Sequence, residues 1–211
     1  MRLGVDEAGK GPVLGSMFTA AVRADPGALP AGVGDSKSIA AGRREELAAA
    51  IRDVADAVAV AEITVERIDD PETDMNALTV AAHAEALAAA AVEGDGAYVD
   101  ASDTNAVRFE RNVATETPVA IDVRGEHGAD ETYPIVGAAS IVAKVEREAH
   151  VELLSAEYGE VGSGYPGDPV TRTFLREYVA EHGCLPACAR ESWQTSRDVL
   201  AATKQSSLGD F

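Results

Sequence analysis

The chain has 211 residues, of which 46% are hydrophobic, so it is long enough to bury the core of one full-sized domain. The sequence predicts no membrane-spanning segment and no signal peptide, because no apolar stretch is long enough and the N-terminus lacks an apolar run. Two cysteines exclude a disulfide scaffold, and a closed zinc site needs four ligands. Cys184 and Cys188 are therefore expected to be buried thiols in a reducing cytoplasm.

The formal net charge is −18, from 36 acidic and 18 basic residues, whereas proteins that bind nucleic acid are usually basic. Acid excess, only four lysines and an alanine- and valine-rich composition are together typical of proteins from salt-loving organisms. At about 1 M salt the Debye length is about 3 Å, so this charge would hardly act at a distance. The acidity therefore indicates a saline cytoplasm, and any nucleic-acid substrate would be bound by close contacts.

Periodicity and turn residues predict the secondary structure. In chain order, the predicted elements are a strand ending at Val5, a strand at 16–23, a loop at 25–34, a helix at 40–57, a strand at 58–65, a helix at 74–93, strands at 97–101 and 117–123, a helix from 134 to about 158, and helices near 171–182 and 191–204. In the first helix, Leu47, Ile51 and Val54 form the expected apolar stripe. Strands come early and helices late, which predicts a mixed α/β domain with a helical C-terminal extension.

Residues 6–12 read Asp-Glu-Ala-Gly-Lys-Gly-Pro and follow the first strand directly. Adjacent carboxylates repel each other unless a cation lies between them, and a divalent metal is the common solution. Gly9 and Gly11 allow the backbone to approach a bulky ligand, and their amide groups can donate to phosphate or hydroxyl oxygens. A metal site beside such a loop suggests phosphodiester chemistry.

Two later acids are candidate partners of this pair. Asp100 closes a short apolar strand, and Asp130 lies just before the helix that Pro134 opens. Strand ends and helix starts commonly converge at one edge of an α/β sheet, where sites form. Taken singly, each acid also has a structural interpretation: Asp130 could complement a helix dipole, and nearby Asp103 is expected to cap a following helix.

Five longer stretches follow one another along the chain: DEAGKGPVLGS at 6–16, DSK at 35–37, YVDASD at 98–103, ADETYPIVGAASIVAKVER at 129–147 and GSGYPGDP at 162–169. In these stretches, and so over nearly its whole length, the chain resembles the archaeal form of ribonuclease HII, the type 2 ribonuclease H, in which they occur in the same order. The resemblance implies a ribonuclease H-like mixed sheet flanked by helices, forming one catalytic domain over residues 1–204. It also implies hydrolysis of RNA within RNA–DNA hybrids and at ribonucleotides embedded in duplex DNA.

Carried over to this chain, the family's metal-binding and catalytic carboxylates fall on Asp6, Glu7, Asp100 and Asp130. Their oxygens suit two hard cations, Mg²⁺ or Mn²⁺. Such ions can activate a water on one side of a phosphodiester and stabilise the leaving oxygen on the other. The expected products therefore end in a 3′-hydroxyl and a 5′-phosphate, because a water and not the neighbouring 2′-hydroxyl attacks.

The family's substrate-binding loop corresponds to Gly9-Lys10-Gly11, which is implied to contact the 2′-hydroxyl that distinguishes RNA from DNA. Many relatives carry arginine where this chain has Lys10, so the charge is kept and the guanidinium fork is lost. Tyr165 is implied to pack on the deoxyribose that follows the ribonucleotide. The residues alone would favour a different role for Tyr165, a turn aromatic that covers the core.

Ser140, Lys144 and Arg147 fall at i, i+4 and i+7, on one face of the helix that begins at residue 134. Together with Lys37 they are assigned to the substrate site, where the basic side chains would bind phosphate or balance charge. For Lys144 and Arg147, a solvated helix face with a Lys144–Glu148 pair is a competing interpretation.

The last residues, KQSSLGDF at 204–211, resemble a peptide that binds the sliding clamp PCNA. Gln205 is followed by Leu208 and Phe211, which are three apart and would form one apolar plug in a tight turn. A frayed terminus is the alternative. Residues 205–211 are therefore expected to be a clamp-binding tail. The enzyme itself is expected to be a monomer and to have no membrane contact.

Two other functions fit parts of the pattern. A junction-resolving or transposase-type nuclease with the same fold also uses clustered acids. A nucleotide-binding switch could use the glycine loop, although the P-loop spacing G-x-x-x-x-G-K-[ST] is absent. The four histidines show no ligand spacing and no serine–histidine pairing, and Phe174 and Trp193 are expected in the core.

Overall fold

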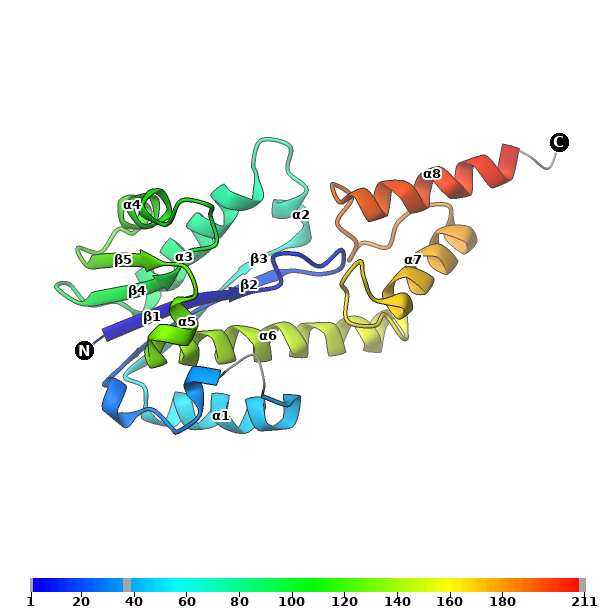
Figure 1. Cartoon of the computed structure of the whole chain (residues 1–211). Helices are drawn as coiled ribbons and strands as arrows, with labels where there is room; N and C mark the ends of the chain where they lie inside the picture. The colour runs from blue at the N-terminus through cyan, green and yellow to red at the C-terminus, as the bar shows by residue number, and fades with distance from the viewer. Residues whose placement is uncertain (1, 36–38, 209–211) are drawn as a thin grey trace.

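The computed structural model describes the backbone of residues 2–35 and 39–208 and the side chains of residues 2–34 and 39–202. The described residues form one five-stranded sheet (Figure 1). Its strands are β1 (Arg2–Ala8), β2 (Met17–Ala24), β3 (Ala57–Ile63), β4 (Gly96–Asp100) and β5 (Asp122–Glu126). The order across the sheet is β3-β2-β1-β4-β5, in which β1, β4 and β5 are parallel and β2 is antiparallel to both of its neighbours.

Helices cover both faces of this sheet (Figure 1). They are α1 (Ala41–Val54), α2 (Val65–Ile68), α3 (Met75–Ala90), α4 (Ala106–Glu116), α5 (Ala129–Thr132), α6 (Pro134–Tyr158), α7 (Pro169–His182) and α8 (Gln194–Leu208), with short 3₁₀ turns at Pro26–Ala28 and Val33–Asp35. Helices α3 and α4 lie on one face, and α1 and α6 lie on the other. Helix α6 continues beyond the sheet to α7 and α8, which form the C-terminal extension with its own apolar cluster (Figure 1). In the described part of the chain, the helices are too short or too polar to cross a membrane.

Strand β1 alternates between these two layers, and this alternation positions the site. Leu3 and Val5 are fully buried in the core beneath α3 and α4. The intervening Gly4 faces α6 so closely that a Cβ atom there would lie 2.2 Å from the carbonyl carbon of Ile135. The absence of a side chain at residue 4 therefore lets α6 pack directly on the backbone of β1, beside the residues that follow.

The predicted fold class is confirmed, and the helix predicted from residue 134 to 158 has those bounds. The strand predicted at 117–123 is wrong, because β5 begins only at Asp122. Thr117 instead caps the end of α4, with its hydroxyl donating to the carbonyl of Val113 at 2.8 Å, and Pro118 has no N–H for a sheet ladder. Helix α8 runs through residue 208, so its backbone includes the first four residues of the predicted tail.

Four side-chain predictions also need correction. Val54 is 42% exposed, because it lies in the last turn of α1, past the part of the helix that packs on the core. Cys184 is exposed, and only Cys188 is buried. Trp193 is half-buried, whereas Phe174 lies in the core as expected. The cap of α4 is Asn105, whose side chain accepts from the amide of Arg108.

Asp103, the predicted cap, has a different partner. Both of its carboxylate oxygens accept from the guanidinium of Arg108, at distances of 2.6 to 3.0 Å. This hydrogen bonding lowers the pKa of Asp103 to about 2. Asp103 therefore anchors the loop that follows β4 and leaves the helix start to Asn105.

Candidate active site

Asp6 and Asp100 lie side by side at the carboxyl ends of two parallel strands. Val5 of β1 is opposite Val99 of β4 in the register, and each acid is the next residue along its strand. Side chains alternate along a strand, so both carboxylates point to the face opposite Val5 and Val99, which is the face that α6 covers. The sheet itself therefore brings together two acids that are far apart in sequence.

Asp6 is 6% exposed, and burial raises its pKa well above the usual value. Repulsion from Glu7 and then from Asp100 raises the pKa further, while hydrogen bonding from Ser140 of α6 acts in the opposite direction. Ser140 is fully buried, so it lies at the inner end of the site. The structure thus joins Asp6, Glu7, Asp100 and Ser140 in one electrostatic environment.

Asp130 lies in the first turn of α5, which begins beside the end of β4. The backbone amide of the preceding Ala129 donates to Asp100 Oδ1 at 2.8 Å, which ties the start of α5 to the end of β4. Asp130 is buried, and the pKa of Asp100 is raised by burial and by repulsion from Asp130 and Glu7. Asp100 therefore links the four predicted carboxylates, because it interacts with each of the other three.

Glu7 has a partner that sequence reasoning missed. His83 is fully buried in α3, and its Nε2 donates to Glu7 Oε2 at 2.9 Å. Burial by itself would raise the pKa of Glu7, but the hydrogen bond and charge interaction with His83, together with the charge of Lys10, lower it. A signal was present, since His83 shares the buried stripe of its helix with Val80 and Leu87.

The glycine loop leaves β1 directly after Glu7 and Ala8. Gly9 has a φ of 89°, a left-handed conformation that glycine adopts without strain. The ammonium group of Lys10 reaches across to the loop after β4, where it donates to the carbonyl and hydroxyl oxygens of Ser102 at 3.2 and 3.1 Å. Lys10 therefore connects the two strand ends that carry Asp6 and Asp100.

Arg147 of α6 is 5% exposed, which rules out the solvated-face interpretation for this residue. A Cβ atom on Gly9 or Gly164 would lie 3.0 or 2.7 Å from its side chain, so the two glycines enclose it. Its Nη2 donates to the carbonyl of Leu14 at 2.8 Å, while its buried Nε and Nη1 have no hydrogen-bond partner among the described residues. Burial lowers the pKa of Arg147 to about 10, which leaves the guanidinium charged at neutral pH.

Glu148, the residue after Arg147, forms an ion pair with Arg44 of α1, with 2.5 Å from Glu148 Oε1 to Arg44 Nη2.

Asp6, Asp100, Asp130 and Ser140 do not line the open cleft of about 620 Å³ that lies beside Glu7 and the glycine loop. Among the residues that line it are Glu7, Gly9, Lys10, Gly11, Lys144, Arg147 and Tyr165. Tyr165 is 48% exposed, so the interpretation of this residue as an aromatic covering the core is wrong. Lys37 and Phe211 lie outside the described residues, as do the side chains of Gln205 and Leu208.

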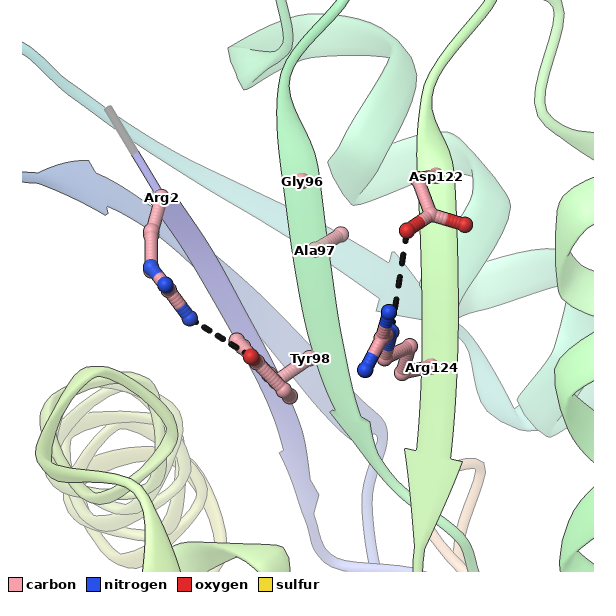
Figure 2. A pocket seen from close by; sticks show the side chains of 6 residues that line it. All are labelled: Arg2, Gly96, Ala97, Tyr98, Asp122 and Arg124. Carbon is pink, nitrogen blue, oxygen red and sulfur yellow. Dashed lines mark hydrogen bonds and ion pairs between the residues drawn. The ribbon is translucent and has the colours of Figure 1, made fainter.

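A second hollow, of about 370 Å³, lies at the opposite end of the parallel strands (Figure 2). Its side chains are already paired with each other. Arg2 Nη1 donates to the hydroxyl of Tyr98 at 2.5 Å, and Arg124 Nε lies 3.6 Å from Asp122 Oδ2. None of the predicted site residues that the structure describes lines this hollow, whereas Glu7 and the glycine loop line the cleft at the carboxyl ends of the strands.

The acids of the site suit a divalent metal. Within the described part of the chain, no three acidic, histidine or cysteine side chains are already arranged to hold an ion by themselves. The four carboxylates nevertheless offer the hard oxygen ligands that Mg²⁺ and Mn²⁺ prefer. Mutual repulsion contributes to the raised pKa of Asp6 and of Asp100, and a cation among them would relieve that repulsion.

A mixed sheet flanked by helices, with acids at the carboxyl ends of β1 and β4 and a glycine loop beside them, is the arrangement expected of an enzyme of the ribonuclease H-like class. Residues 3–196 match the family model for ribonuclease HII. The chain therefore belongs to the ribonuclease HII family of metal-dependent endonucleases, which cleave RNA in RNA–DNA hybrids. The predicted family and activity are confirmed.

Individual relatives agree with this assignment. The chain is 66% identical to ribonuclease HII of Haloarcula marismortui over all of both chains, and a halophilic relative agrees with the salt-adapted composition. The crystal structure of ribonuclease H2 from Pyrococcus horikoshii OT3 superposes with a TM-score of 0.90 at 36% identity, covering 97% of this chain and 99% of that one. The ribonuclease HII in the PCNA:RNase HII complex from Archaeoglobus fulgidus gives a TM-score of 0.85 at 40% identity, covering 94% and 96%.

Proposed function

We propose that this chain hydrolyses RNA in hybrids and at single ribonucleotides in duplex DNA through Asp6, Glu7, Asp100 and Asp130, which hold two Mg²⁺ or Mn²⁺ ions. The observation that carries the proposal is the parallel register that sets Asp6 beside Asp100, where Glu7 repels both acids and Asp130 repels Asp100. When bound, the ions would supply an activated water and stabilise the leaving oxygen.

The protein's part in this mechanism is to hold the acids in place. Hydrogen bonding from Ser140 acts on Asp6, His83 donates to Glu7, and the amide of Ala129 donates to Asp100. Each of these contacts leaves the acid with further oxygen lone pairs for a metal. Such supporting hydrogen bonds orient metal ligands and are commonly as important as the ligands' own identity.

We propose that Arg147, Lys144 and Lys37 bind the substrate's phosphates. The two buried guanidinium nitrogens of Arg147 without a partner among the described residues support this, because a phosphate oxygen is a suitable acceptor for them. The exposed ring of Tyr165, in the same cleft, is proposed to pack on the sugar after the ribonucleotide, and the Gly9–Gly11 loop to contact the 2′-hydroxyl. We further propose that the enzyme acts as a monomer in a saline cytoplasm.

Cleavage of a DNA duplex that carries one ribonucleotide tests the proposed substrate and mechanism together. We expect cutting at the ribonucleotide with Mg²⁺ or Mn²⁺, products with 3′-hydroxyl and 5′-phosphate ends, and no cutting of the all-DNA duplex of the same sequence. End-group analysis of the labelled products provides the measurement. Equal cutting of the all-DNA duplex would favour a junction-resolving or transposase-type nuclease, and 2′,3′-cyclic phosphate ends would refute attack by a water.

We also propose that residues 205–211 bind the sliding clamp. The similar structure from Archaeoglobus fulgidus is a complex of ribonuclease HII with PCNA, and in this chain α8, whose backbone includes residues 205–208, extends away from the sheet (Figure 1). Deletion of 205–211 is expected to abolish capture by the clamp and to leave cleavage of a short hybrid unchanged, because residues between 7 and 165 line the cleft. A pull-down and a cleavage assay on the same preparation check this. Loss of both activities, or retained capture, would contradict it.

A further inference from the structure

The C-terminal extension holds the glycine loop through its carbonyl oxygens. Arg190, in the segment between α7 and α8, donates from Nη2 to Gly9 O at 2.6 Å and from Nη1 to Lys10 O at 2.9 Å. Its Nε donates to Gly15 O at 2.9 Å. Trp193 donates from Nε1 to Gly11 O at 3.3 Å. Three consecutive carbonyls of the loop thus accept hydrogen bonds from two side chains more than 170 residues later.

Arg190 is unusual because it is fully buried and its hydrogen-bond partners are main-chain carbonyls. Its guanidinium also lies under the ring of Trp193, with 4.8 Å from Cζ to the ring centroid. A buried charge is costly unless its donors are satisfied, and here the rigid fork of arginine matches three oxygens at once. Lysine, a single flexible ammonium, cannot reproduce that arrangement.

The direction of these carbonyls fixes the direction of the loop's amides. The described peptide bonds are trans, so each C=O points opposite to the N–H of the next residue. Because Gly9 O and Lys10 O point at Arg190, the N–H groups of Lys10 and Gly11 point away from it. Gly9, Lys10 and Gly11 are among the residues that line the cleft, and Arg190 is not. The carbonyl of Gly11 orients no third N–H group in this way, because the next residue, Pro12, has no backbone N–H.

Backbone contacts fasten the same two segments over a longer stretch. The amide of Gly15 donates to Cys188 O at 2.7 Å, and the amide of Arg190 donates to Val13 O at 2.9 Å. A β-bridge joins Leu14 to Ala189 between these bonds. The segment that carries Arg190 is therefore a fixed support for the loop.

We infer that Arg190 and Trp193 are positioning residues that hold the glycine loop with two amide N–H groups presented to the substrate, so that the C-terminal extension is part of the substrate site. The inference rests on the proposed function, in which this loop contacts the ribose. Neither residue needs to touch substrate. Their effect is on where the loop's donors lie, so a displaced loop loses contacts that bind the ribose in the ground state and in the transition state alike.

The test uses the full-length Arg190→Lys and Trp193→Phe variants. Arg190→Lys keeps the charge and loses the fork, and Trp193→Phe keeps an aromatic ring over Arg190 and loses the bond to Gly11. We expect hydrogen–deuterium exchange of the amides in residues 9–15 to become faster in both variants. We also expect KM for a hybrid to rise about tenfold or more in Arg190→Lys, with a smaller change in kcat, because ground-state contacts are lost.

Arg23→Lys is the matched control. The guanidinium of Arg23 forms an ion pair with Asp95, with 2.7 Å from Nε to Oδ2, at the end of β2 far from the glycine loop. Arg23→Lys therefore also replaces a guanidinium by an ammonium group, but it changes no contact of the loop. In Arg23→Lys, we expect the hydrogen–deuterium exchange of the amides in residues 9–15 and the KM for a hybrid to equal those of the unmodified protein. Unchanged exchange in both loop variants, or the same KM change in Arg23→Lys, would overturn the inference. If Arg190→Lys does not fold, Trp193→Phe decides the question. If the unmodified protein fails to cut a hybrid, the proposed function falls, whereas the exchange measurement still decides the positioning of the loop.

Discussion

Asp6→Asn is expected to reduce cleavage of an RNA–DNA hybrid by about a thousandfold or more, because the loss of a metal ligand should exceed the roughly 10- to 100-fold effect of losing a ligand's supporting partner. Asparagine has nearly the same shape, so packing against Ser140 and α6 is kept. What disappears is the negative charge beside Asp100 and Glu7. Single-turnover cleavage with saturating Mg²⁺ and with Mn²⁺ measures the loss.

The same substitution is expected to leave thermal stability unchanged or to raise it. Asp6 is buried next to two like charges, so in the absence of metal its ionised form works against the fold. Activity and stability should therefore move in opposite directions, as they do where a site is assembled at the expense of stability.

Asp95→Asn is the matched control for this prediction. Asp95 is also largely buried, but it accepts from Arg23 at 2.7 Å and from the amide of Val92 at 3.0 Å, at the end of the sheet far from the acids. Its replacement should lower the melting temperature and preserve cleavage. If Asp6→Asn instead lost stability and kept its activity, Asp6 would be a structural residue and the proposed metal site would be wrong.

Gly4→Ala is expected to destabilise the fold by about 3 kcal/mol, at the upper end of what overpacking usually costs. The added methyl group would lie 2.2 Å from both the carbonyl carbon and the oxygen of Ile135 and 2.5 Å from the amide nitrogen of Val136. These are backbone atoms, so no side-chain rotation relieves the clash. Helix α6 must move away from β1, and Ser140 must move with it, away from Asp6.

Urea unfolding at fixed salt measures the stability, and cleavage of the hybrid should fall in the same variant. Gly96→Ala is the control on the neighbouring strand. Gly96 lies opposite Arg2 at the edge of the hollow in Figure 2, and a Cβ atom there meets no atom within 4 Å. With no clash and a less flexible unfolded chain, Gly96→Ala should be neutral or stabilising by about 0.5 kcal/mol. Equal stability of the two variants would contradict the close packing of α6 on β1.

Some local elements were predictable because their signals are local. Pro134 suits the first turn of a helix, and Gly159 follows the last residue of α6, so the bounds of this helix could be predicted from its ends. The strand predicted at 117–123 failed for a complementary reason. A short apolar run does not by itself specify a strand: Pro118 and Ala120 are exposed, and the pairing with β4 begins only at Asp122.

The sequence by itself indicated the family and the glycine loop and, through the family resemblance, the four acids of the candidate site, because each matching stretch is a pattern of residue types at short spacings. Only the tertiary structure decided that Asp6 and Asp100 are neighbours, that His83 holds Glu7, and that Arg190 holds the glycine loop. These contacts join residues 76 to 181 positions apart in the chain. The physical reason is that parallel register, helix packing and the docking of the C-terminal extension arise from burial of whole faces. No local pattern specifies which distant side chain will meet a given carboxylate or carbonyl.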